Sequence, residues 1–225
     1  MSKVTVSFKV PPKLWENFRQ QSDDLFLSRA PFLNYMLRQE LSRLEEELRG
    51  LRQSLRAKRH ISGRLKVTGP TPVSIEVDGE VAATLRRVVK QHNMVRDAFI
   101  CRLLVFLRST DTLLTWLEVP KAALGGRRSG GLADMPTSPL RAMEAVRDDP
   151  LYYVRNHVED VQGCGIYRVA LPPGAEWASC YLPDDEVPTT GAFRRRQKDL
   201  NLMLSLLEPE TVSSRARRGS RGAKK

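Results

Sequence analysis

The sequence predicts a mainly helical fold with short β-strands, in which one strand–helix–helix unit occurs twice, followed by a small α+β domain. Three observations lead to this prediction. Apolar residues alternate near the start of the chain and are followed by two amphipathic segments. The same pattern returns 67 positions later. Beyond a Gly-rich stretch the character changes, because residues 1–139 carry a net charge of +9, whereas residues 140–212 carry −4.

The first element is a strand over Lys3–Val10. Its even-numbered residues are all apolar (Val4, Val6, Phe8 and Val10), and its odd-numbered residues are basic or hydroxyl-bearing (Lys3, Thr5, Ser7 and Lys9). Strand side chains switch faces at each residue, so the apolar set shares one face and the polar set the other. A single strand of this kind needs a partner strand to be stable.

Two helices follow and complete a first unit over residues 1–48. The first helix is expected after Pro11-Pro12, because proline is tolerated in the first turn of a helix. The second helix is expected to begin at Ser28, a suitable N-cap residue, with Pro31 in its first turn. Apolar residues at helical spacing then include Phe32 and Met36.

The second helix is predicted to continue beyond residue 48. A seam of leucines follows the 4-3-4-3-4 spacing of a heptad repeat: Leu37, Leu41, Leu44, Leu48, Leu51 and Leu55. The seam predicts either an extended helix that packs on its own chain or a short coiled coil between protomers. Residues 49–69 form a basic helical extension and linker, since seven basic residues and no acid lie between Arg49 and Lys66. Such a run is either a solvated helix end or a surface that follows phosphates.

The unit repeats over residues 70–119. At an offset of 67, nine apolar positions of the first unit fall on apolar positions of the second, for example Phe8 on Ile75 and Phe18 on Leu85. Arg29 likewise falls on Arg96. Nine matches in one register favour a duplicated unit. A pair of unrelated amphipathic hairpins is the alternative.

The remaining chain divides into three parts. Residues 120–139 are rich in glycine and are predicted to be a linker. Residues 140–212 are predicted to form the α+β domain, with helices from Ser138, over Leu151–Val161 and over Phe193–Leu207, and with two strands. The strands are expected at Cys164–Ala170 and Trp177–Leu182. Residues 213–225 form a disordered basic tail.

The strand–helix–helix unit of residues 3–41 resembles the ribbon-helix-helix fold of Arc/MetJ-type repressors, and with its repeat over residues 70–119 the chain resembles two such units in tandem. In that family two strands form an antiparallel ribbon that enters the DNA major groove. The resemblance implies that Lys3, Thr5, Ser7 and Lys9 read base edges. It also implies that Ser28 and Arg29 hold a phosphate at the start of the second helix. An ordinary surface strand protected by lysines is the alternative for Lys3–Val10.

The second unit departs from the family pattern at the positions that would contact DNA. Ser74 and Glu76 are its outward ribbon residues, followed by Asp78, and Val95 stands where the first unit has Ser28. Carboxylates are repelled by phosphates, although a glutamate can accept from cytosine N4. We therefore expect weaker DNA contacts from this unit, which either pairs with the first strand or mediates dimerisation.

Composition supports an anionic partner and argues against catalysis. The net charge of +11 favours polyanions, and double-stranded DNA is the expected partner, with Arg56, Lys58 and Arg59 adding phosphate contacts. Three cysteines and three histidines show no metal or nucleophile–base spacing, so we expect no cofactor, no metal and no enzymatic activity. Without a signal sequence or apolar span, the expected location is cytoplasmic, on a bacterial nucleoid or plasmid, and not in a membrane.

These observations lead to three functional hypotheses. The first is a sequence-specific DNA-binding protein that acts as a transcriptional repressor. The second is an antitoxin that binds its own promoter and neutralises a toxin through residues 140–212. The third is a relaxosome or partition accessory protein of a mobile element. A homodimer through the ribbon or the leucine heptad, and a protein partner at residues 140–212, are further expectations.

Overall fold

The structure is a computed structural model that describes residues 2–119, 149–188 and 203–207. It is mainly helical, with one two-stranded antiparallel sheet. The elements run in the order β1 (Lys3–Val10), α1 (Pro12–Asp24), α2 (Arg29–Glu47), α3 (Leu55–Val67), β2 (Thr71–Asp78), α4 (Gly79–Gln91), α5 (Arg96–Arg108), α6 (Asp111–Trp116), α7 (Tyr152–Gln162) and the short 3₁₀ helix η3 (Glu176–Ala178). Residues 203–205 are also helical.

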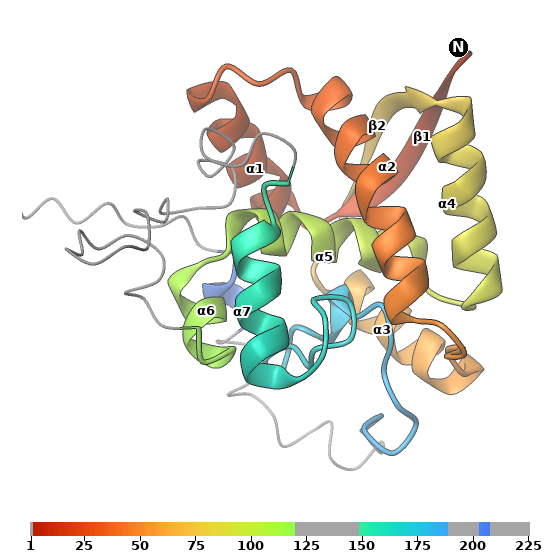
Figure 1. The fold of residues 1–225 in the computed structure, drawn as a ribbon, viewed down its shortest axis with the longest axis vertical. Coiled ribbons are helices and arrows are strands. Elements are labelled where there is room, and N and C mark those ends of the chain that lie inside the picture. Colours follow the sequence, from red (N-terminus) through yellow and green to blue (C-terminus); the bar gives the residue numbers. More distant parts are fainter. Residues whose placement is uncertain (1, 120–148, 189–202, 208–225) are drawn as a thin grey trace, which may run out of the picture.

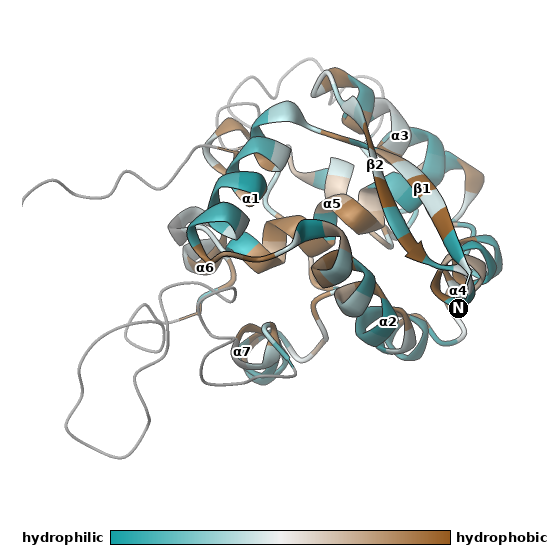
Figure 2. Ribbon diagram, turned by 90° about the horizontal axis from the view of Figure 1, so that it is seen from above, coloured by the Kyte–Doolittle hydropathy of each residue, from teal (hydrophilic) through white to brown (hydrophobic). Residues whose placement is uncertain are grey.

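The partner of the first strand lies in the same chain. β1 and β2 pair antiparallel over their whole length, with Ser7 opposite Ser74. Alternation along both strands is visible in Figure 2 as alternating hydrophilic and hydrophobic residues. Phe8, Val10, Ile75 and Val77 are buried on the inner face, as the pattern of single residues predicted.

The two units repeat in backbone geometry. α1 and α4 have bounds that differ by 67 residues, and α2 and α5 begin 67 residues apart. The turns between these helices also match. Phe26 and Asn93, again 67 apart, both have positive φ angles of 55° and 51°. The backbone N–H of Phe26 bonds to Asp23 and that of Asn93 bonds to Lys90, at equivalent positions. The offset read from apolar residues is therefore reproduced in the backbone.

The two units interlock around one core. α2 packs against β2 and α4, whereas α5 packs against β1 and α1, so the second helix of each unit contacts the other unit. In Figure 1 the ribbon lies in the upper half of the molecule, α5 crosses the middle, and α3, α6 and α7 lie below. Apolar side chains of all these elements contribute to one buried cluster, to which α3 adds Leu65. A small second cluster joins Ala57 and Ile61 of α3 to Ala98, Leu182 and Val187.

The predicted continuation of the second helix is wrong. α2 ends at Glu47, and Gly50 then adopts φ +77°, a left-handed conformation that favours glycine and stops a helix. α3 begins separately, and its N-cap Ser54 accepts a hydrogen bond from the Ala57 N–H at 3.0 Å. The leucines up to Leu48 are buried in the chain's own core, whereas Leu55 is 63% exposed. The heptad seam is therefore used within the chain.

The two strands predicted at Cys164–Ala170 and Trp177–Leu182 do not form. The first segment is turns and irregular backbone, and the second begins within η3 and continues as irregular backbone. The physical reason is the side chain of Arg102 on α5, which is 1% exposed and donates to the backbone carbonyls of Ile166, Val169 and Ala178. The guanidinium thus bonds carbonyls that a strand would use for a ladder. The helix predicted over Leu151–Val161 is present as α7.

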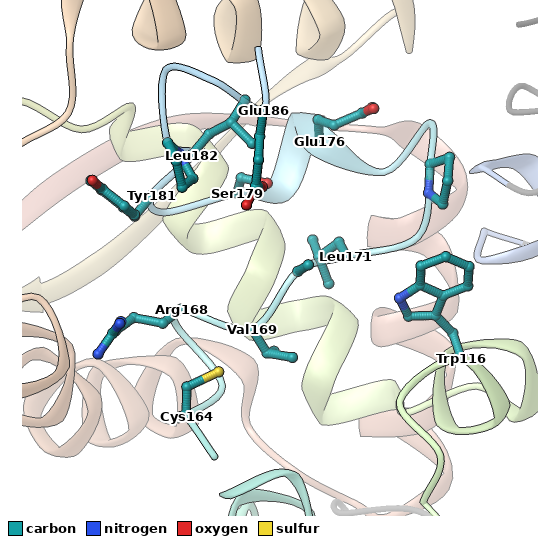
Figure 3. Close-up of a pocket in the computed structure, with 13 residues that line it drawn as sticks. Trp116, Cys164, Arg168, Val169, Leu171, Glu176, Ser179, Tyr181, Leu182 and Glu186 are labelled. Carbon is teal, nitrogen blue, oxygen red and sulfur yellow. The ribbon is translucent and has the colours of Figure 1, made fainter. Parts of the chain in front are cut away.

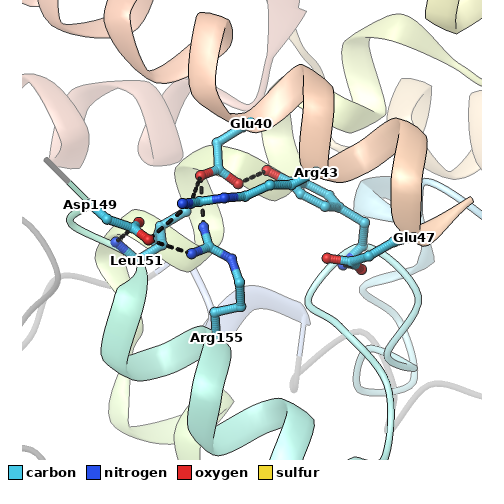
Figure 4. Close-up of polar contacts among 7 residues, drawn as sticks. Glu40, Arg43, Glu47, Asp149, Leu151 and Arg155 are labelled. Atoms are coloured by element: carbon cyan, nitrogen blue, oxygen red, sulfur yellow. Dashed lines mark hydrogen bonds and ion pairs between the residues drawn. The ribbon is translucent and has the colours of Figure 1, made fainter.

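An ionic cluster attaches the α7 region to α2 (Figure 4). The carboxylate of Glu40 is fully buried and accepts from Arg43, from Arg155 at 2.7 Å and from the Tyr167 hydroxyl at 2.6 Å. Asp149 accepts from the same two arginines. Since residues 151–178 also contribute to the main hydrophobic cluster, the described part of residues 140–212 packs into the body of the protein and does not form a core of its own.

Several predictions concern residues outside the described part of the chain. These are the linker at 120–139, the helix from Ser138, most of the helix over Phe193–Leu207 and the basic tail at 213–225. Among the described residues, no helix combines the length and apolar character needed to cross a membrane.

Candidate nucleic-acid interface

The outer face of the β1–β2 ribbon is exposed and polar. Thr5, Ser7 and Lys9 of β1 and Ser74 and Glu76 of β2 all point to solvent, as expected from the alternation. Pairing places Thr5 opposite Glu76 and Lys9 opposite Pro72. The alternation along the two strands therefore predicts the exposed face correctly, and the pairing shows which side chains are neighbours across it.

A serine pair marks the centre of this face. Ser7 and Ser74 are directly opposite, and their hydroxyl oxygens are 2.7 Å apart, in hydrogen-bond contact. They are also the only cross-strand partners that are equivalent residues at the offset of 67. A pseudo-two-fold axis relating the two units therefore passes between them.

Lys3, which is predicted to read base edges, makes an ion pair within the chain. Its ammonium donates to Asp78 Oδ1 at 2.8 Å, while Asp78 Oδ2 accepts from Asn34 at 2.8 Å and from Arg38 at 2.7 Å. The hydrogen bonds from Lys3 and Asn34 lower the pKa of Asp78 from 3.8 to about 2. Asp78, which sequence analysis placed on the outer face, is thus buried, and it ties the end of the ribbon to α2.

Three other side chains of the outer face have no partner of this kind among the described residues. Within the described part of the chain, Thr5, Lys9 and Glu76 make no side-chain hydrogen bond or ion pair and are exposed. Two opposite charges and three hydroxyls are therefore available for contact with a ligand on this surface.

The helix starts next to the ribbon are uncapped. Ser28 occupies the N-cap position of α2, but its side chain makes no capping hydrogen bond, contrary to the prediction. Arg29 pairs with Asp23 at 2.6 Å. The start of α5 also has no side-chain cap, and there Arg96 pairs with the adjacent Asp97. The first turns thus keep N–H groups without a side-chain acceptor, but their arginines are held by acids.

The basic residues of α3 are not brought to the ribbon face. α3 packs on α5 and η3, below the ribbon in Figure 1. Arg56 donates to the Val187 carbonyl at 2.9 Å, and Lys58 donates to Asn93 at 3.0 Å. Arg59 is exposed on the outer side of α3. Arg56 and Lys58 therefore each make a hydrogen bond within the protein, and their phosphate role stays a prediction.

A pocket of about 330 Å³ lies among the irregular residues 164–186 (Figure 3). Its lining mixes apolar side chains, including Trp116 and Leu171, with polar ones, including Arg168, Ser179 and Glu186. Glu176 at its edge pairs with Arg64 of α3 at 3.4 Å.

The described residues do not assemble a catalytic or metal site. Among them, no group of three His, Cys, Asp or Glu side chains could hold a metal ion. Burial raises the pKa of Cys101 well above its usual value and that of Cys180 to about 12. Both thiols are therefore protonated at neutral pH and are poor nucleophiles.

The residues that attach the end of the ribbon to α2 were not predicted from the sequence. Asn34 and Arg38, which hold Asp78, lie on one face of α2 at a spacing of four. That spacing was a usable signal, but their partner Asp78 lies 44 residues from Asn34 and 40 residues from Arg38 in the chain. Arg102 gave a weaker signal, as the one charged residue inside an apolar run.

Comparison with known proteins adds no family assignment: no family model, curated protein or solved structure matches this chain.

Proposed function

We propose that this protein binds double-stranded DNA sequence-specifically through the β1–β2 ribbon and acts as a transcriptional repressor. The observation that carries the proposal is the outer ribbon face, a row of exposed hydroxyl, amine and carboxylate side chains on an eight-residue antiparallel pair. The resemblance of each unit to the ribbon-helix-helix fold, and the interlocking of the two units, support it.

The dimensions and chemistry of the face suit the major groove. That groove is about 12 Å wide and admits a two-stranded ribbon. Lys9 suits the guanine O6 and N7 acceptors, and the hydroxyls of Thr5, Ser7 and Ser74 suit mixed donor and acceptor edges. Glu76 suits the N4 amino group of cytosine. Lys3 contributes to the shape of the ribbon, because its ammonium is bound to Asp78.

We assign the main phosphate contact to the start of α2. The uncapped start of α2 offers backbone N–H groups beside the ribbon, and helix starts of this kind bind anions. Arg29 would have to exchange its contact with Asp23 for a phosphate. The net charge of +9 over residues 1–139 supplies long-range attraction to DNA.

The test is the double variant Thr5→Ala/Ser7→Ala. We expect a loss of sequence preference of about tenfold or more, with non-specific, salt-dependent binding retained, because base contacts specify while phosphate contacts position. Affinities for a selected site and for scrambled DNA are measured over a salt series. Ser42→Ala, which removes an exposed hydroxyl on α2, is the matched control and should leave the preference unchanged. Unchanged preference in the double variant would disprove the role of the ribbon.

The antitoxin hypothesis is less favoured by the described residues. Segments that neutralise a toxin are often disordered until they bind, whereas the apolar side chains of residues 151–178 are buried in this chain's own core. A role as relaxosome or partition accessory uses the same ribbon contacts and differs only in the location of the site. Genomic footprinting separates the two, because a repressor protects a promoter and an accessory protein protects an origin of transfer or a partition site.

A further inference from the structure

The two halves of the ribbon face are related by the pseudo-two-fold axis but carry different chemistry. Because the axis passes between Ser7 and Ser74, position 9 of β1 is equivalent to position 76 of β2. These positions hold Lys9 and Glu76, both exposed and without a side-chain partner among the described residues. Charge is therefore inverted between the two equivalent positions.

The remaining positions add to this difference. Thr5 is equivalent to Pro72, so one half carries a hydroxyl where the other half carries a side chain with no donor or acceptor. Along the ribbon, one end presents Lys9 beside Pro72. The other end presents Glu76 beside Thr5, followed by Lys3, whose charge is compensated by Asp78. One end of the face is thus basic and the other is acidic.

Different chemistry requires different base pairs. A lysine side chain donates to guanine acceptors, and a glutamate accepts from the cytosine amino group and is repelled by phosphates. A palindromic site would present the same base edge to both equivalent positions, and one of the two contacts would then be wrong. Both strands of the ribbon also come from one chain, so a second chain is not needed to complete it.

We infer that a single chain reads a non-palindromic duplex site in one fixed orientation, with Lys9 and Glu76 selecting different base pairs on the two halves. This inference rests on the proposed function, since it assigns the kind of site that the ribbon recognises.

The decisive experiment is a charge exchange between the equivalent positions, Lys9→Glu/Glu76→Lys. Sites are selected from a random duplex pool with the full-length wild-type chain and with the variant. We expect a non-palindromic motif for the wild type and, for the variant, a motif in which the preferences of the two halves are exchanged. Against its own motif each protein should bind about tenfold to hundredfold more tightly than against the other's.

Two controls keep the result interpretable. The exchange Lys13→Glu/Glu16→Lys, between exposed residues of α1, conserves net charge off the ribbon and should leave the motif unchanged. Glu76→Gln, a change of nearly constant shape at an exposed position, should relax preference at one half of the motif only. This second variant decides the question if the exchanged chain does not fold.

The outcomes separate the inference from the proposed function. A palindromic motif, two chains per site by light scattering of the complex, or an unchanged motif in the exchange variant would overturn the inference while leaving sequence-specific binding in place. Failure of the wild-type chain to enrich any motif would instead overturn the proposed function itself.

Discussion

The second helices of the two units, α2 and α5, begin at equivalent positions but lie in different surroundings. α2 buries one face, including Leu33 and Met36, and leaves the other open. Every residue of α5 from Ala98 to Arg108 is buried. The cause is what was added around the repeat, because α3 and η3 pack against α5. The added residues contact α2 at Glu40 and Glu47 and leave its outer face open. The repeat specifies the backbone, and the additional segments decide which surfaces remain free.

This difference changes what equivalent residues do. Arg102 of α5 corresponds to Tyr35 of α2. Tyr35 is partly exposed, whereas Arg102 is enclosed, stacks over the Phe106 ring at 5.5 Å and holds the segment 166–178 through three carbonyls. Burial lowers the pKa of its guanidinium, yet arginine stays charged at any physiological pH.

The largest effect is expected from Arg102→Leu. Leucine cannot reach the carbonyls of Ile166, Val169 and Ala178, and a buried acceptor without a donor costs about 1–3 kcal/mol. We expect the free energy of unfolding, measured in urea, to fall by about 3 kcal/mol or more. Tyr35→Leu, at the equivalent position, should cost about 1 kcal/mol. Equal losses in the two variants would contradict the structural role of Arg102.

The matched turns give a second comparison, with effects of opposite sign. Phe26 and Asn93 share a left-handed backbone, but Phe26 is 96% exposed, while Asn93 donates to the Gln53 carbonyl at 2.8 Å and accepts from Lys58. Phe26→Gly should stabilise the protein by up to about 1 kcal/mol, since glycine removes the steric cost of positive φ. Asn93→Gly should destabilise it by about 1–3 kcal/mol through the lost hydrogen bonds.

Thermal or urea unfolding of these two single variants measures both changes. Two changes of the same sign would show that backbone strain, and not the contacts of residues 53 and 58, dominates at position 93.

The smallest effect is expected at Asp78, whose equivalent in the first unit is Pro11. Its partners Lys3 and Arg38 are about half exposed, and water screens such pairs. The pKa of Asp78 is lowered from 3.8 to about 2, so its stabilising contribution is present above about pH 4 and is lost as the pH falls toward 2.

Asp78→Asn should therefore be less stable than the wild type at neutral pH, and the difference should close between about pH 4 and pH 2. Urea midpoints of the two proteins across this range provide the measurement. A difference that stays constant down to pH 2 would mean that the charge of Asp78 does not contribute.

Local pattern was sufficient for much of the fold and of the candidate site. Alternation located β1, β2 and their outer residues Thr5, Ser7, Lys9, Ser74 and Glu76, and helical spacing located α1, α2, α4 and α5. The predictions from local pattern were wrong where another residue changed the backbone. The segments at 164–170 and 177–182 alternate like strands, but the Arg102 guanidinium donates hydrogen bonds to backbone carbonyls in both. The leucine seam continues in sequence, but Gly50 turns the backbone and ends the helix.

By itself, the sequence determined the strands β1 and β2, the helices α1, α2, α4 and α5, and the offset of 67 residues between them, because strand and helix periodicities are local properties of neighbouring residues. Only the tertiary structure decided that the two strands pair within one chain, that Lys3 is bound to Asp78, and that Lys9 and Glu76 occupy equivalent places. Register and ion pairing depend on residues far apart in the chain, and a period of two or 3.6 residues carries no information about them.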